Sequence, residues 1–191
     1  MTIYSFYLTL VIPLLITPLF SQQSELHSAY NIPFGSSEEL VIQKMAKTFQ
    51  VEPSITYNRD NYNVLEFYNV KDDYGKINKL RFFVSEPTGV FRIESEFFLR
   101  WYLQIPDADN LENHQHFIET VLYNLRKQYG TESIYEPPNI TRKFELNDYV
   151  TATWQFKNNR WLHLIYETQD WTIWPELSKI IIIYRDSNFS P

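Results

Sequence analysis

The chain has 191 residues, a net charge of −6, 17% aromatic residues and no cysteine. Without cysteine it has no disulfide, no thiol nucleophile, no cysteine-based metal site and no lipid-anchored cysteine. Because acidic and basic residues are mixed along a chain of negative balance, we expect no nucleic-acid or anionic-lipid partner, since both require a dense basic surface.

The first 22 residues predict a cleaved signal peptide. No charged side chain precedes Glu25, and residues 6–20 form an apolar run that contains Pro13 and Pro18. This run is short for a membrane span, and the two prolines would break a spanning helix. We therefore expect a secreted or periplasmic protein with no stable membrane insertion after cleavage. An uncleaved N-terminal anchor is the alternative.

Residues 23–191 predict a single α+β domain that opens with a polar lead-in over Gln22–Pro33. A first helix is expected from about Ser37 to Phe49, because Ser36 and Glu39 have the spacing of a capping box. The apolar side of this helix would consist of Val41, Met45 and Phe49.

Strands are expected next at Ile55–Tyr57, Tyr62–Val70 and Lys79–Ser85. A longer strand is expected after Gly89, either continuous or interrupted near Ser95. In this strand Phe91, Ile93 and Phe97 alternate with Arg92, Glu94 and Glu96. Glu94 and Glu96 could flank a bond as paired carboxylates, but their basic neighbours favour a solvated, charge-balanced face.

A second helix is expected from about Leu111 to Tyr129, with Gly130 as its C-cap. Its apolar stripe follows the helical period at His114, Phe117, Ile118, Val121, Leu122, Leu125 and Tyr129.

Two strands, Tyr149–Lys157 and Arg160–Glu167, would then form a hairpin around a two-residue turn at Asn158–Asn159. That register places Phe156 opposite Trp161, Trp154 opposite His163 and Ala152 opposite Ile165. A last strand, Lys179–Arg185, contains four consecutive isoleucines, as expected of a strand that is covered on both sides.

The order of these elements predicts an antiparallel sheet with two helices packed on one face. Two tandem helix-plus-sheet units, over residues 34–105 and 110–187, fit the order equally well.

The segment Phe34–Val41, a hairpin around Gly75–Lys76 and a helix ending at Tyr129–Gly130 resemble small exported bacterial domains of the BamE-like and β-lactamase-inhibitor-like type. The resemblance covers residues 34–130 and implies helices on an antiparallel sheet with a partner-binding role. The chain lacks the lipobox cysteine of the BamE-like lipoproteins, and no functional residue is carried over.

Catalytic and metal-binding motifs are absent from the sequence. It contains no G-x-S-x-G and no H-E-x-x-H, and its four glycines form no phosphate-binding loop. His114 and His116 would point to different sides of a helix, so they cannot chelate together. His163 is expected in a structural role, or at a pH-sensitive interface. We predict no catalytic residue, no metal and no cofactor.

Trp171 and Trp174 are the predicted partner-binding residues, because they place large aromatic rings in a segment between two strands. A lid over the core is the alternative interpretation of this segment. The sequence therefore predicts an exported, non-enzymatic binding or accessory module that contacts a protein partner, of open oligomeric state. A carrier of a hydrophobic small ligand is the alternative function, and an exported hydrolase is a weaker one.

Overall fold

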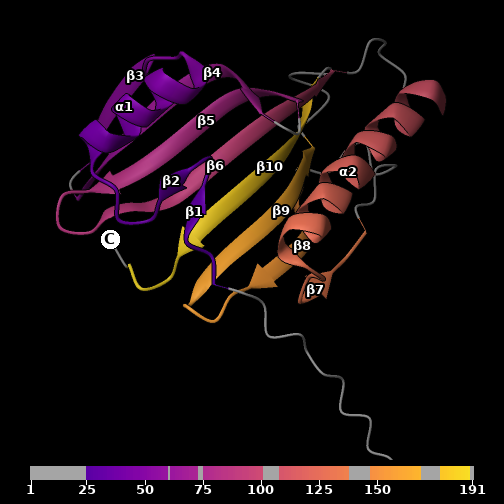
Figure 1. Cartoon of the computed structure of the whole chain (residues 1–191). Coiled ribbons are helices and arrows are strands. Elements are labelled where there is room, and N and C mark those ends of the chain that lie inside the picture. Colours follow the sequence, from indigo (N-terminus) through magenta and orange to yellow (C-terminus); the bar gives the residue numbers. More distant parts are fainter. Residues whose placement is uncertain are drawn as a thin grey trace, which may run out of the picture.

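The computed structural model describes residues 25–59, 61–72, 75–100, 108–137, 147–168 and 177–189. These residues form a mixed α+β fold with an eight-stranded antiparallel sheet, a two-stranded sheet and the helices α1 (Glu38–Phe49) and α2 (Ala108–Tyr129) (Figure 1). The predicted leader, residues 1–22, lies outside the described residues. Within the part of the chain that is described, neither helix is long and apolar enough to span a membrane.

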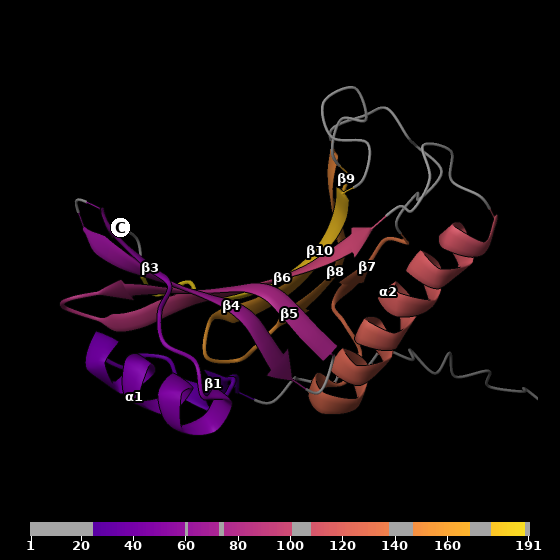
Figure 2. The same ribbon diagram turned by 90° about the horizontal axis from the view of Figure 1, so that it is seen from above.

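The large sheet has the strand order β3-β4-β5-β6-β10-β9-β8-β7. Its strands are β3 (Ile55–Arg59), β4 (Tyr62–Asp72), β5 (Gly75–Ser85), β6 (Gly89–Arg100), β7 (Ile134–Tyr135), β8 (Asn147–Gln155), β9 (Arg160–Thr168) and β10 (Leu177–Asp186). Along the chain, α1 precedes β3 to β6 and α2 precedes β7 to β10. The two groups of strands join where β6 pairs with β10, near the centre of a strongly twisted sheet (Figure 2).

Helix α1 begins one residue later than the predicted capping box implies. Ser37 is its N-cap and accepts a hydrogen bond from the Leu40 amide at 3.4 Å. The Ser36 hydroxyl is buried and has no hydrogen-bond partner among the described residues. Ser36 instead contributes its backbone, because its carbonyl accepts from the Val90 amide at 2.9 Å. This bond joins the start of α1 to the start of β6.

The predicted stripe of α2 is confirmed for its C-terminal half. Ile118, Val121, Leu122 and Leu125 are buried, and Gly130 ends the helix with a φ of 82°. A left-handed residue is the usual way for a helix to end, and glycine adopts that conformation at low cost.

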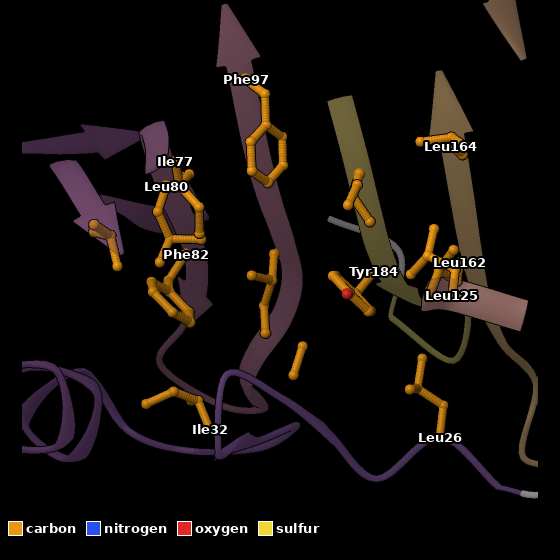
Figure 3. Packing of buried hydrophobic residues seen from close by; sticks show 14 of the residues in the cluster. Leu26, Ile32, Ile77, Leu80, Phe82, Phe97, Leu125, Leu162, Leu164 and Tyr184 are labelled. Carbon is orange, nitrogen blue, oxygen red and sulfur yellow. The ribbon is translucent and has the colours of Figure 1, made fainter. Parts of the chain in front are cut away.

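One hydrophobic cluster contains side chains from both helices and from one face of the large sheet. We call this face the cluster face and the other the polar face. Figure 3 shows Phe82, Phe97, Tyr184 and Leu162 along neighbouring strands of the cluster face. The predicted strand of four isoleucines is β10, a central strand in which Ile180, Ile181 and Ile182 are buried.

The predicted polar lead-in is wrong, because its apolar residues belong to the core. Leu26, Ala29 and Ile32 are buried in the cluster. The strands β1 (Ser28–Ala29) and β2 (Ile32–Pro33) form a hairpin around two residues with positive φ. This is the geometry of a tight two-residue hairpin turn.

The predicted register of the β8–β9 hairpin is also wrong, by one residue. Thr153, rather than Trp154, lies opposite His163. Strand β8 ends at Gln155, and Asn159 takes a φ of 58° next to a bond from the Phe156 amide to the Arg160 carbonyl. A left-handed residue at the end of a three-residue loop gives a different register from a two-residue turn. The shift puts His163 on the polar face, whereas the buried Trp154 lies on the cluster face.

Candidate functional site

Three nearly buried glutamates lie on the polar face of the sheet. Glu66 on β4 and Glu94 and Glu96 on β6 are 3%, 5% and 3% exposed. Residues of this face alternate with the buried residues Phe67, Ile93 and Phe97 of the cluster face. A carboxylate held away from water needs a compensating charge, so the neighbours of these groups decide what they can do.

Basic side chains from the adjacent strands provide that charge. Arg81 on β5 contacts both Glu94, at 3.1 Å, and Glu96, while Arg92 contacts Glu94. Lys79 lies 4.0 Å from Glu66, and Lys179 on β10 lies 2.9 Å from Glu167 and 4.0 Å from Glu96. We call these eight residues the polar-face network, in which four acidic side chains face four basic ones.

This network has the character of a structural ion-pair network, not of an acid/base pair. The Tyr68 hydroxyl donates to Glu66, and this hydrogen bond together with burial raises the pKa of Tyr68 to about 12. Each buried carboxylate is already bound by a cation or a hydroxyl. The expected charge balance of Glu94 and Glu96 is therefore confirmed, whereas their expected solvation is wrong.

The histidines do not form a metal site in the described structure. The residues described contain no group of three or more histidine or acidic side chains that could hold a metal ion. His116 is exposed on α2, and the side chain of His114 lies outside the described residues. His163 stacks on Trp161 with ring centroids 6.0 Å apart, and its Nδ1 lies 3.0 Å from the Thr153 hydroxyl. Burial, followed by the charges of Arg185 and Arg92, lowers the pKa of His163.

A pocket of about 450 Å³ lies between the C-terminal ends of the two helices and the β1–β2 hairpin. We call it the tyrosine pocket. Its lining includes Tyr30, Phe49, Lys71, Gln128, Tyr129 and Tyr184. Pockets for small ligands have volumes of roughly 300–1,000 Å³ and aromatic linings, so this one is of the right size and kind. No sequence motif indicates it, because its residues come from five separate elements.

The outer strands of the sheet carry most of the exposed large apolar side chains. Among the described residues, Ile55, Tyr57, Ile134 and Tyr135 are four of the six such side chains, with Phe98 and Tyr123 as the others. Ile55 and Tyr57 belong to β3, whose five residues are all exposed, and the other two form β7. Both strands lie at the ends of the sheet. The sequence analysis predicted the strand at Ile55–Tyr57 and missed β7, and it did not predict that either strand lies at an edge, which depends on strand order.

Trp171 and Trp174, the predicted partner-binding residues, lie outside the described residues. Neither the contact interpretation nor the lid interpretation of that segment is tested by the structure.

Comparisons of this chain with protein-family models, with curated proteins and with solved structures found no match.

Proposed function

We propose that the chain is a non-catalytic binding or accessory module, and that its β3 edge receives an extended segment of a protein partner. The supporting observation is the exposure of Ile55 and Tyr57, at 38% and 41%, on a terminal strand of the sheet. An edge strand presents backbone N–H and C=O groups that a second chain can pair with, and its side chains then provide specificity. Folded proteins usually protect such edges with charges or prolines, and Arg59 is the only charged residue in β3.

The internal arrangement of the fold gives further support. We infer that the two helices pack on one face of the sheet as parts of two tandem units, α1 with β3 to β6 and α2 with β7 to β10. The helix-terminating residues Gln50 and Gly130, with φ of 57° and 82°, are 80 positions apart. At this offset the apolar residues of the helices coincide, as Val41 with Val121, Ile42 with Leu122, Met45 with Leu125 and Phe49 with Tyr129.

The exposed isoleucines occupy equivalent positions in the two units. Ile55 pairs with Glu66 on the second strand of its unit, and Ile134 pairs with Thr153 on the second strand of the other. Ser54 and Ser133, which precede them, donate their amides to the carbonyls of the same two residues at 2.8 and 2.7 Å. An apolar side chain exposed at both equivalent edges supports a role in contact for this position.

Site-specific crosslinking tests the proposed edge. A photo-crosslinking phenylalanine analogue at Tyr57 should capture a protein partner in the native compartment, whereas the same analogue at Tyr123, which is 66% exposed on α2, should not. The double variant Ile55→Lys, Tyr57→Lys should remove the partner and change the free energy of unfolding by less than about 0.5 kcal/mol, because both side chains are exposed. Capture at Tyr123 alone, or undiminished pull-down of the partner by the double variant, would refute the β3 site.

Trp171 and Trp174 remain proposed contact residues. If they contact the partner, replacing both with alanine should abolish capture with a stability change below about 0.5 kcal/mol. Loss of about 3–5 kcal/mol for each replacement would instead assign the rings to the core. We also propose export to a periplasm or to the medium. The mature chain should then start near residue 23, which mass measurement of native material would determine.

The tandem-unit proposal has its own test. If residues 1–104 and 105–191 are produced together as two chains, they should assemble into a 1:1 complex with the far-ultraviolet circular dichroism of the intact protein. Recovery of two unassociated chains, each with native-like secondary structure, would contradict the shared core. Failure of both to fold would contradict the division between the units.

A further inference from the structure

The tyrosine pocket has a floor whose rings are already fixed. Tyr184, on β10, is 2% exposed, and Tyr30 and Tyr129 pack on it edge to face with centroids 6.0 and 6.3 Å away. The Tyr30 hydroxyl is hydrogen-bonded to that of Ser95, and Tyr129 is hydrogen-bonded to Tyr184 and Gln128. Burial raises the pKa of Tyr129. Because these rings are held in place, a ligand would meet a preformed aromatic surface and would not have to order it.

The backbone around this pocket adopts unusual conformations. Tyr30 has a φ of 53°, which is rare for a residue with a bulky side chain. Of the five non-glycine residues with positive φ in the described chain, Tyr30 and Asn31 line the pocket, and Gln50 and Asn69 lie within two residues of its lining. Asparagine tolerates this conformation, Gln50 ends a helix, and Tyr30 and Asn31 are the two central residues of the β1–β2 turn, which requires positive φ at both. The turn therefore fixes the backbone from which the Tyr30 ring enters the pocket lining.

The charge of the described pocket lining is positive, although the protein is net negative. Among the described residues of the lining, Lys71 is the one charged side chain, whereas the whole chain carries −6. Lys44 lies beside it and donates to the Asn31 carbonyl at 2.8 Å. Lys47 and Lys127, in the last turns of the two helices, offset the partial negative charge of the helix ends. An anionic group is therefore accommodated here in preference to a cationic one.

We propose that the tyrosine pocket binds a small anionic amphiphile, with its apolar body on the tyrosine floor and its carboxylate paired with Lys71. This site is separate from the β3 edge, so the proposal does not depend on the protein partner. The double variant Ile55→Lys, Tyr57→Lys should bind the amphiphile as the unmodified chain does.

Titration of the ¹⁵N-labelled full chain with octanoate, followed by heteronuclear NMR, tests the proposal. The largest shifts are expected at the amides of Asn31, Phe49 and Gln128, with saturation at millimolar octanoate or below. Shifts confined to other parts of the sheet, or no saturable shift at 10 mM octanoate, on the order of the weakest specific affinities, would overturn it.

Charge variants and a neutral probe separate the pocket from general attraction of anions. Lys71→Gln should weaken octanoate binding about five-fold, the contribution of one partly exposed ion pair, and should leave the binding of octanol unchanged. Lys157→Gln makes the same change of charge at an exposed turn residue outside the lining, and it should have no effect. Equal weakening by the two variants would assign the binding to net charge and overturn the role of Lys71.

Discussion

Replacing Arg81 with methionine should destabilise the protein more than the loss of a surface ion pair would. The side chains of Glu94 and Glu96 are 6% and 4% exposed and share the guanidinium of Arg81, whose side chain is 26% exposed. Removing one partner of a buried ion pair leaves an uncompensated charge and costs about 3–5 kcal/mol, against about 0–1 kcal/mol at the surface. Because Arg81 is partly hydrated, and Arg92 and Lys179 remain nearby, we expect about 3 kcal/mol. Methionine preserves most of the apolar stem, so the loss reports on the charge.

Urea unfolding at pH 7 measures this loss. With a slope of about 2 kcal/mol per molar urea, the midpoint should fall by about 1.5 M. The matched control is Glu25→Gln, which breaks a pair with His27 whose side chains are 53% and 73% exposed and should cost less than about 1 kcal/mol.

A triple variant distinguishes charge compensation from packing. Adding Glu94→Gln and Glu96→Gln to Arg81→Met removes the uncompensated charges and should restore at least half of the lost stability, since neutral replacement of a whole buried cluster is tolerated. If Arg81→Met behaves like the surface control, or if the triple variant is less stable than the single one, the polar-face network does not stabilise the fold by charge pairing.

Three further predictions concern single positions. The pKa of His163 is lowered in the folded state, so the unfolded chain takes up this proton first as the pH falls. The contribution of His163 to stability should therefore be constant above about pH 6.5 and should decrease below it. His163→Gln should remove that part of the decrease in urea unfolding measured at several pH values. Trp154→Ala should cost about 3–5 kcal/mol in the same assay, because this ring is fully buried and its indole N–H donates to the Gly130 carbonyl at 2.8 Å. Gly89→Ala should be much more destabilising than Gly130→Ala: both have positive φ, but a Cβ at Gly89 would lie 2.2 Å from the Gly35 carbonyl oxygen, whereas at Gly130 nothing lies within 4 Å. Equal melting temperatures for the two alanine variants would contradict the close approach at Gly89.

The parts of the fold that could be predicted are those set by local sequence. The extent of α2 follows from an apolar stripe with a terminal glycine, and β5 from its alternation, so both were located to within a few residues. The predicted two-residue turn between β8 and β9 places the left-handed conformation at both Asn158 and Asn159, and residue type suits both. In the structure Asn159 takes it and Asn158 does not, which changes the register.

Burial on the polar face could not be predicted, because it depends on neighbours across the strands. The alternation in β6 assigned Glu94 and Glu96 to one side correctly, but only the pairing with β5 and β10 places basic side chains over them. Phe91 was assigned to the wrong side. The register of β5 against β6 shifts between Phe83, which pairs with Arg92, and Val84, which pairs with Val90. This shift leaves Phe91 on the polar face, where it contacts Tyr62 and Phe83. The tyrosine pocket was missed for the same reason, since its lining residues are distant in sequence.

If the two units are related, the register of the strands shows where they have diverged. On the proposed division Ile55 corresponds to Ile134, so their partners Glu66 and Thr153 correspond too, and the pairing continues across the next strands. On the cluster face this aligns Leu65, Phe82 and Ile93 with Ala152, Leu164 and Ile182, and all six are buried and apolar. The core therefore imposes the same requirement on both units.

On the polar face the same alignment sets the row Glu66, Arg81 and Glu94 against the row Thr153, His163 and Ile183. The first row is a charged network, whereas the second contains one histidine whose pKa is lowered and no acidic side chain. Folding alone does not require a charged row, since the neutral row of the second unit is sufficient for its strands to pair. The charged row lies in the unit that also carries the five exposed residues of β3. On the proposed function, pairing of the partner with the β3 edge is therefore a property of the first unit, whereas the second unit completes the sheet and the core and carries the proposed contact residues Trp171 and Trp174.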